Sequence, residues 1–278
     1  MTKIYARVLI SSAVALGVSL PAFARFDQSH ALFSKSLSKY VCTNKLDKKN
    51  RGLIKYAEWK KDAKSLDLYL ATVAELTEKE FEKFSDKEKE AFWINAYNAC
   101  AIKAVLRNYP FKQTNKYNPA NSIQQVDNFW EKEKFKVLGQ EHTLYDIEHA
   151  ILRKQFACHD PRVHFAVVGA AKGAPEMPDT AYVATKLDAQ LEDSIDDFLA
   201  RKENLTIDPS KKLIRISQIF KWFPLDFSEA AHLEKKIPPP SDDEIVLVYL
   251  KKKYPDVIPK ETARVIYSSF NWELNECK

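Results

Sequence analysis

The most apolar part of the chain is the segment 88–108, in which hydrophobic residues occupy nearly every side of a helix. A helix of this kind is buried all round, so we predict that the segment is the central helix of the fold. The capping-box pattern Ser85-x-x-Glu88 marks its start. Asn95 and Asn98 lie three residues apart on one face. Because a buried amide without a partner costs about 1–3 kcal/mol, each should bind a defined group, more readily backbone than ligand.

Several other segments carry hydrophobic residues at helical spacing and predict amphipathic helices. Pairs of Ser or Thr with an acidic residue three positions later mark where some of them begin. The predicted helices are 26–41, a segment spanning 59–70, one opened by Thr77-x-x-Glu80, one from 143 to about 154, one over 187–198, and one opened by Ser241-x-x-Glu244.

The helix predicted from residue 143 carries two candidate catalytic residues, Glu148 and His149. At about 100° per residue, Glu148 lies beside the apolar stripe of this helix and needs a cation or a hydrogen-bond donor. His149 shares the other side with Asp146 and Arg153, at spacings of three and four residues. An Asp–His pair with a nearby arginine is geometrically possible, although an exposed helix face with ion pairs explains the same spacing.

Shorter apolar runs between turn residues predict β-strands. We expect a hairpin over 135–144 that turns at Gly139, a second hairpin from 205–207 and 213–216, and a last strand at 265–270. The segment 163–168 is apolar on both faces, which predicts a central strand covered on both sides. The polar segment 110–125 is expected to be a long surface loop.

This order of elements, helices first and then strands and helices mixed, is typical of an α+β protein. We predict a helical N-terminal layer packed on a small, mostly antiparallel sheet in a single domain.

The loop 169–175 follows the predicted strand and contains two of the five glycines of the chain. Glycine is typical of positions that need positive φ or close approach to another backbone or a ligand. We therefore expect a pocket between this loop, the helix of His149 and the asparagines of the central helix. Arg153, Arg162 and Lys172 would suit an anionic group there. The candidate binding residues are Asn95, Asn98, Arg153, Arg162, His164, Gly169, Lys172, Gly173 and Ala174.

Aromatic residues gather in the segment 219–227. Together with Trp130 and Trp272 they would suit a sugar or peptide groove, and core packing explains them equally well. Four histidines lie near one another in sequence, but they lack any recognised metal-ligand spacing, so we predict neither a metal nor a cofactor. These are His142, His149, His159 and His164.

Residues 1–24 have the pattern of a secretory signal peptide, with basic Lys3 and Arg7, an apolar run, and Ala22-Phe23-Ala24 before the cleavage point. The apolar run is shorter than the ~20 residues that a membrane-spanning helix needs. We therefore expect a mature chain of residues 25–278, located in the periplasm or secreted, without a membrane span.

Removal of that segment lowers the formal net charge from +5 to +3. The lysines are mixed with acidic residues at helical spacing, which indicates solvated helix faces rather than a nucleic-acid surface. The expected partner is thus a ligand of the cell envelope or the exterior, and the sequence leaves the oligomeric state open.

The four cysteines of the chain all lie after the signal segment. An even number in an exported protein permits one or two disulfides, and the pairing stays open. Cys100 lies on the apolar helix, where a buried free thiol is as consistent as a bridge. The other three are Cys42, Cys158 and Cys277.

Five segments, in this order, resemble the domain-of-unknown-function 547 family, and the resemblance covers nearly all of the chain after the signal segment. It implies no particular activity, because the family has no generally established one. The segments are Ala91-Phe-Trp-Ile-Asn-Ala-Tyr-Asn98, Thr143-Leu-Tyr-Asp-Ile-Glu-His149 with Leu152-Arg153, Asp160-Pro-Arg-Val-His-Phe-Ala166, Ile219-Phe-Lys-Trp222 with Asp226-Phe227, and Asn271-Trp-Glu-Leu-Asn275.

The chain departs from the family pattern in the loop 169–175. The resemblance implies two cysteines there, the first at Val168 or Gly169 and the second at Ala174, and both are absent. If the loop thiol is a nucleophile in relatives, this chain lacks that chemistry, since alanine cannot form a covalent intermediate. If the two thiols form a bridge or a redox pair, their joint loss is the expected pattern.

Two functions are compatible with these residues. The first is a non-catalytic exported protein that binds a ligand or partner in a pocket with a degenerate thiol loop. The second is a hydrolase or transferase in which His149 or His164 is the general base, Glu148 or Asp146 orients it, and an asparagine holds an oxyanion or water. The second requires a histidine nitrogen and a carboxylate about 3 Å apart at one cavity.

Overall fold

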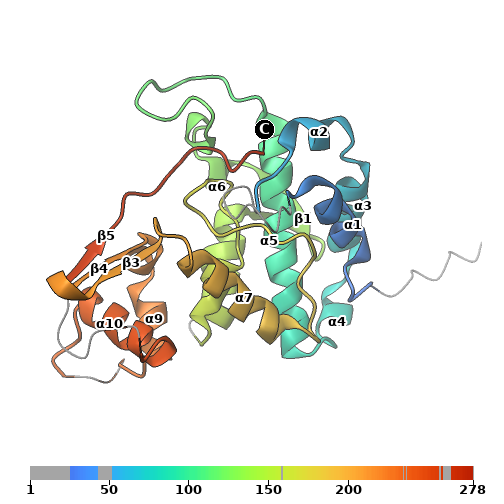
Figure 1. The fold of residues 1–278 in the computed structure, drawn as a ribbon. Helices are drawn as coiled ribbons and strands as arrows, with labels where there is room; N and C mark the ends of the chain where they lie inside the picture. Colours follow the sequence, from blue (N-terminus) through green and yellow to red (C-terminus); the bar gives the residue numbers. More distant parts are fainter. Residues whose placement is uncertain are drawn as a thin grey trace, which may run out of the picture.

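The computed structural model describes residues 26–42, 52–157, 159–233, 235, 237–256, 258 and 264–277. The predicted signal peptide and Cys158 lie outside these residues. The helix α5 (Asp86–Asn108) stands at the centre of the molecule and is buried along most of its length, as predicted (Figure 1). Its start is the predicted capping box, in which Ser85 and Glu88 bind each other's backbone N–H groups.

A layer of N-terminal helices packs on α5, which confirms the helical N-terminal layer (Figure 1). The segment 59–70 forms two helices, not one. The break lies at Asp62, whose carboxylate accepts hydrogen bonds from Lys39 and Tyr40 of the first helix. The helices are α1 (Ala31–Tyr40), α2 (Tyr56–Lys61), α3 (Lys64–Glu75) and α4 (Glu78–Phe81).

Two small sheets confirm the α+β class. The strands β1 (Lys134–Val137) and β2 (Gln140–Thr143) form the predicted antiparallel hairpin, with Leu138 and Gly139 at positive φ in its turn. The strands β3 (Leu205–Asp208) and β4 (Leu213–Ile216) form the second hairpin, and β5 (Arg264–Tyr267) adds to β4 in parallel. Two of these three strand pairings are antiparallel, as expected.

The three-stranded sheet has its own hydrophobic cluster, beside the cluster around α5. The helices α9 (Pro224–Ala230) and α10 (Asp242–Lys253) lie next to this sheet, and α7 (Leu187–Leu199) lies between the sheet and α5, with residues in both clusters (Figure 1). The remaining elements are η1 (Ile123–Gln125), α6 (Phe129–Lys132), the 3₁₀ helix η3 (Pro161–Phe165), η4 (Pro209–Lys211) and α8 (Ile219–Trp222), with the π-helix η2 (Asp146–Ala157) between β2 and η3.

The central strand predicted over 163–168 is wrong, because this segment begins as the 3₁₀ helix η3. The Asp160 carboxylate accepts the backbone N–H of Arg162, and Pro161 fixes φ at the first helical position. The segment is apolar on both faces since Val163 packs in the cluster around α5 and Phe165 in the cluster of the sheet. The continuous apolarity of 163–168 therefore reflects burial between two hydrophobic clusters and not pairing in a sheet.

The side chain of Asn98 provides the backbone hydrogen bonds that a neighbouring strand would give to the segment 163–168. Its amide nitrogen donates to the carbonyl of Ala166 at 2.9 Å, and its amide oxygen accepts the N–H of Val168 at 2.9 Å. Asn95 binds Tyr182 in the same way, through the carbonyl at 2.8 Å and the N–H at 3.0 Å. Both asparagines are fully buried and bind backbone, which is the role that the sequence favoured.

Replacing Asn98 by alanine should lower the free energy of unfolding by about 2–3 kcal/mol, because a buried N–H and a buried carbonyl both lose their partner. Urea denaturation measures this loss. Asn108→Ala, on the same helix but only half-buried, is the matched control and should cost less than about 1 kcal/mol. Equal losses in the two variants would show that the amide of Asn98 does not hold the segment.

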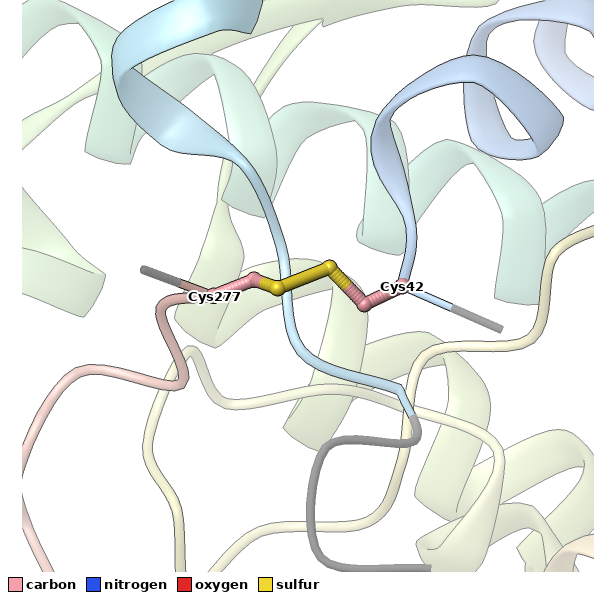
Figure 2. The surroundings of a disulfide bond; sticks show 2 residues. All are labelled: Cys42 and Cys277. Carbon is pink, nitrogen blue, oxygen red and sulfur yellow. A yellow bond between two sulfur atoms is a disulfide. The ribbon is translucent and has the colours of Figure 1, made fainter. Parts of the chain in front are cut away.

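After β5 the chain returns across the molecule to the N-terminal helices (Figure 1). There Cys277 forms a disulfide with Cys42 (Figure 2), so one of the permitted pairings is present. Ile54 supports it by donating to the carbonyl of Asn275 at 2.8 Å and accepting the N–H of Cys277 at 3.0 Å. Cys100 is a buried free thiol. None of the helices in the described ranges has the length and apolarity to cross a membrane.

Glu90 of α5 gives the protein a pH-dependent stability. Burial, together with the nearby negative charge of Asp160, raises the pKa of Glu90 to about 7. Its buried Oε1 atom has no hydrogen-bond partner in the described part of the chain. A raised carboxyl pKa means that the stabilising contribution of the protonated group is complete at pH 4 and is lost as pH rises through 7.

Glu90→Gln should therefore be about as stable as the wild type at pH 4 and more stable by about 2–3 kcal/mol at pH 8. Urea denaturation at both pH values measures the difference. The control is Glu82→Gln at an exposed position before α5, which should change the free energy of unfolding by no more than about 0.5 kcal/mol. A Glu90→Gln effect that is the same at both pH values would contradict the raised pKa.

Candidate functional site

A cavity of about 250 Å³ opens where segments from distant parts of the sequence meet. It brings together five of the residues predicted from the sequence. The helix η2 supplies two of them, η3 supplies one, and the loop 169–175 supplies the others. These are Glu148, His149, His164, Gly169 and Ala174.

The helix that carries Glu148 and His149 is a π-helix rather than the predicted α-helix. Its start is the predicted cap, in which Asp146 accepts from the backbone N–H and the hydroxyl of Thr143 at 2.9 and 2.8 Å. The wider turn changes which residues share a face, so the 100° spacing no longer applies. Asp146 is occupied by the cap, and the Asp146–His149 pair considered from the sequence does not form.

Glu148 has a hydrogen-bond donor, as its position beside the apolar stripe led us to expect. The hydroxyl of Tyr97, on α5, donates to Oε2 of Glu148 at 3.0 Å. Burial raises the pKa of Glu148, because little solvent remains to stabilise the carboxylate. Among the described residues no lysine, arginine or histidine forms an ion pair with it. The Glu148 carboxyl group, in the wall of the cavity, thus has a neutral hydrogen-bond partner, and the more distant positive charge of Arg153 opposes the effect of burial on its pKa.

A histidine and a carboxylate meet at 2.8 Å beside the cavity, as acid–base chemistry requires. They are His164, whose Nε2 contacts Oδ2, and Asp226 of α9. Arg153 binds the same carboxylate through Nε at 2.9 Å and Nη2 at 3.2 Å. Sequence reasoning missed Asp226 as a site residue, since 62 positions separate it from His164.

The protonation of this pair follows from its surroundings. Burial lowers the pKa of His164, although Asp226 opposes the shift. Burial would raise the pKa of Asp226, but the hydrogen bonds from His164 and Arg153 outweigh it and hold the pKa below its usual value. At neutral pH the pair is therefore a neutral imidazole that donates from Nε2 to a carboxylate. Nδ1 of His164 is then an unprotonated base, without a hydrogen bond from any described residue.

His149 is also neutral at pH 7. Burial and the positive charge of Arg153 lower its pKa. Nη1 of Arg153 lies 3.3 Å from Nδ1 of His149, and a guanidinium can only donate, so Nδ1 accepts and the ring proton lies on Nε2. Phe223 stacks on His164 with ring centroids 4.0 Å apart and also receives the Arg153 guanidinium on its face, which fixes both groups.

The loop 169–175 is held in place by the C-terminal segment. Ala171 pairs with Leu274 in a β-bridge, and Gly173 donates to the carbonyl of Asn271 at 2.8 Å. A Cβ atom at position 173 would lie 2.7 Å from the Asn271 nitrogen, so glycine is required there by the approach of two backbones. Arg201 adds a hydrogen bond to the carbonyl of Ala174 at 2.8 Å. This wall of the cavity is therefore formed without a ligand.

Aromatic side chains make up much of the remaining wall. Of the two expectations for the aromatic residues, a groove and core packing, this part agrees with the groove. Trp222 and Tyr145 lie at the rim and are 43% and 47% exposed. In contrast, Phe220 and Phe227 of the same aromatic run are buried in the core. The run therefore both lines the cavity and packs in the core. The aromatic lining residues are Tyr97, Trp130, Tyr145, Trp222, Phe223, Phe270 and Trp272.

The other predicted binding residues lie outside the lining of the cavity. Arg162 pairs with Asp160, Asp188 and Glu192 at 2.6–3.0 Å. Lys172 pairs with Glu273 at 2.7 Å and, with Gly173, lines a separate hollow of about 1050 Å³. Arg153 is paired with Asp226, and the two asparagines bind backbone. The three cations thus lie apart, each beside a carboxylate, and do not form an anion site together.

Positions 169 and 174 face each other across the loop. A Cβ atom built on Gly169 lies 3.8 Å from the Cβ atom of Ala174. Disulfides have Cβ–Cβ distances of about 3.5–4.5 Å, so two cysteines at these positions have the spacing of a bridge. This geometry favours the interpretation of the two family cysteines as a disulfide or redox pair, with the first at position 169.

The double variant Gly169→Cys/Ala174→Cys should form an internal disulfide on air oxidation, seen as a linked peptide in non-reducing peptide mapping. Gly139→Cys/Ala174→Cys is the control, since a Cβ atom at position 139 has no heavy atom within 4 Å to pair with. Two free thiols in the first variant after oxidation would contradict the pairing.

Comparison with known proteins agrees with the resemblance. Residues 81–199 match the family described as "Protein of unknown function, DUF547". This range includes α5, the π-helix and the loop 169–175, but not the aromatic residues of the C-terminal part. No curated protein and no solved structure matches the chain.

Proposed function

We propose that the domain whose residues 81–199 match the DUF547 family, completed by the C-terminal aromatic residues, binds a small organic ligand without thiol chemistry. The observation that carries the proposal is the preformed aromatic cavity with Glu148, His149 and His164 in its wall. Concave, mostly apolar sites with a few polar groups are typical of ligand pockets. The indole of Trp222 lies at the rim, 43% exposed, where a ligand can contact it.

Gly169 and Ala174 exclude a nucleophilic thiol at the loop positions that the family resemblance implied for cysteine. Their small side chains also leave room in the cavity that larger residues would fill. The ligand therefore binds in the space beside this loop.

A ligand-observed NMR screen of small organic compounds tests the proposal. Trp222→Ala should weaken the compounds that bind by at least tenfold. Leu225→Ala is the matched control, because Leu225 is an exposed hydrophobic residue outside the cavity. A screen without any compound that is sensitive to Trp222→Ala would refute ligand binding at this site.

Acid–base catalysis is the second candidate, favoured by the 2.8 Å contact between His164 and Asp226. In that reaction Nδ1 of His164 would take a proton from a water molecule that attacks the substrate, as in a hydrolase or transferase without a thiol. Turnover of an ester, amide or glycoside panel should then disappear in His164→Gln. It should also rise with pH through a midpoint below 6.5, as the lowered pKa of His164 requires. Activity that persists in His164→Gln would exclude this role.

We also propose that the protein works in an oxidising compartment, the periplasm or the cell exterior. The disulfide between Cys42 and Cys277 supports this, because such bonds persist in oxidising compartments and are rare in the cytosol. The signal-peptide pattern of residues 1–24 points the same way. Cell fractionation with thiol alkylation should find the bridge intact in the envelope or medium, and a reduced cytosolic protein would contradict it.

A further inference from the structure

The charged residues in the wall of the cavity are all acidic. Glu148 lies in the wall and Glu131 of α6 at its exposed edge, and no lysine or arginine is among the described residues of the lining. Both histidines of the wall are neutral at pH 7, because burial lowers the pKa of each. Arg153, behind His149, is paired with Asp226. The cavity therefore offers two carboxyl groups and, among the described residues that line it, no unpaired positive charge.

The indoles and phenyl rings of one wall are packed as a group. Trp272 lies at the centre of the group, with ring centroids 4.5 Å from Phe270 and 6.0 Å from both Trp130 and Trp222. Trp130 stands at 73° to Trp272, so the rings do not lie in one plane. Aromatic faces carry partial negative charge, and several of them around one space attract a cation, tryptophan most strongly.

Resting on the ligand-binding function proposed above, we infer that the ligand is a small organic cation with a quaternary ammonium head group. The indole rings of Trp222 and Trp272 would contact the methyl groups, and Glu148 would supply the counter-charge. Such a ligand would provide the ion-pair partner that Glu148 lacks among the described residues, and its positive charge would favour the ionised carboxylate against the effect of burial. Aromatic cages are a recurrent solution for quaternary ammonium groups.

The dimensions of the cavity agree with a head group of this kind. Pockets for drug-sized ligands measure about 300–1,000 Å³, and this one measures about 250 Å³. It therefore takes a small molecule or only the head group of a larger one. An anion is disfavoured, since it would lie beside Glu148 and aromatic faces without a free cation to bind it.

Choline and its uncharged carbon isostere, 3,3-dimethyl-1-butanol, form a matched pair of probes. They share shape and hydroxyl group and differ only in the charge of the head group. Titrations of wild-type protein at constant ionic strength, followed by ligand-observed NMR, should show choline binding at least tenfold more tightly than the isostere. This comparison needs no variant and so cannot fail through misfolding.

Variants then locate the effect. Glu148→Gln should weaken choline at least tenfold and narrow the difference between the probes. Glu141→Gln, an exposed glutamate of β2 outside the cavity, should leave both affinities unchanged. Thermal unfolding of each variant verifies that it is folded.

The outcomes separate this inference from the function on which it rests. Equal binding of the two probes, or no binding of choline while screened compounds still bind in a manner sensitive to Trp222→Ala, overturns the cationic ligand and leaves the binding site. If no screened compound binds the cavity at all, both are overturned.

Discussion

Replacing Asp226 by alanine is expected to lower the free energy of unfolding by about 3–5 kcal/mol, which is typical when one member of a buried charged network is removed. The Asp226 carboxylate is 9% exposed and binds both His164 and Arg153. Without it, the guanidinium of Arg153 keeps its charge in a half-buried place, and Nε2–H of His164 loses its acceptor. Urea denaturation measures the loss.

Glu229→Ala is the control for Asp226, on the same helix. Glu229 also pairs with a histidine, His159, but both side chains are solvent-accessible, and such pairs contribute about 0–1 kcal/mol. Losses of unfolding free energy of equal size in Asp226→Ala and Glu229→Ala would contradict the buried network.

Asp226→Ala should in addition lower the pKa of His164 further, because the negative charge that opposes the effect of burial is gone. NMR titration of the histidine resonances measures this pKa.

Breaking the disulfide should destabilise the protein by about 4 kcal/mol. The bridge joins residues 235 positions apart, and the unfolded chain gains much freedom when a loop of this length opens. Cys42→Ala/Cys277→Ala, compared with the wild type by urea denaturation, gives the value. Dithiothreitol should shift the wild-type transition and leave that of the double variant unchanged. A reductant effect of equal size on both proteins would show that the bridge is not its cause.

The disulfide also holds part of the cavity wall in place. Phe270 and Trp272 lie in the segment between β5 and Cys277, so the bridge anchors the segment that supplies part of the aromatic wall. Reduction is therefore expected to weaken ligand binding as well as stability.

The local features of the fold could be predicted from the sequence because their causes are local. The capping pairs at Ser85, Thr143 and Ser241 and the turn at Gly139 all form where their patterns placed them. The burial of the central helix followed from its lack of a polar face. The pocket expected between the loop 169–175 and the helix of His149 forms, but the asparagines expected in it bind backbone elsewhere.

The errors came from features that depend on tertiary contacts. Apolarity on both faces of 163–168 indicated burial correctly but not its form, because the partner of this segment is the side chain of Asn98 and not a strand. The π-helix changes the angular spacing on which the predicted helix face depended. Asp226 could not be assigned, since only folding brings α9 to η3.

We propose that the aromatic cavity beside Glu148 and His164 holds the ligand. The most direct measurement is a crystal structure with the tightest-binding compound of the screen, phased independently of the ligand. We predict electron density for the compound between Trp222, Trp272 and Glu148. Density found instead only in the hollow beside Lys172 and Arg201, with the aromatic cavity empty, would contradict the claim.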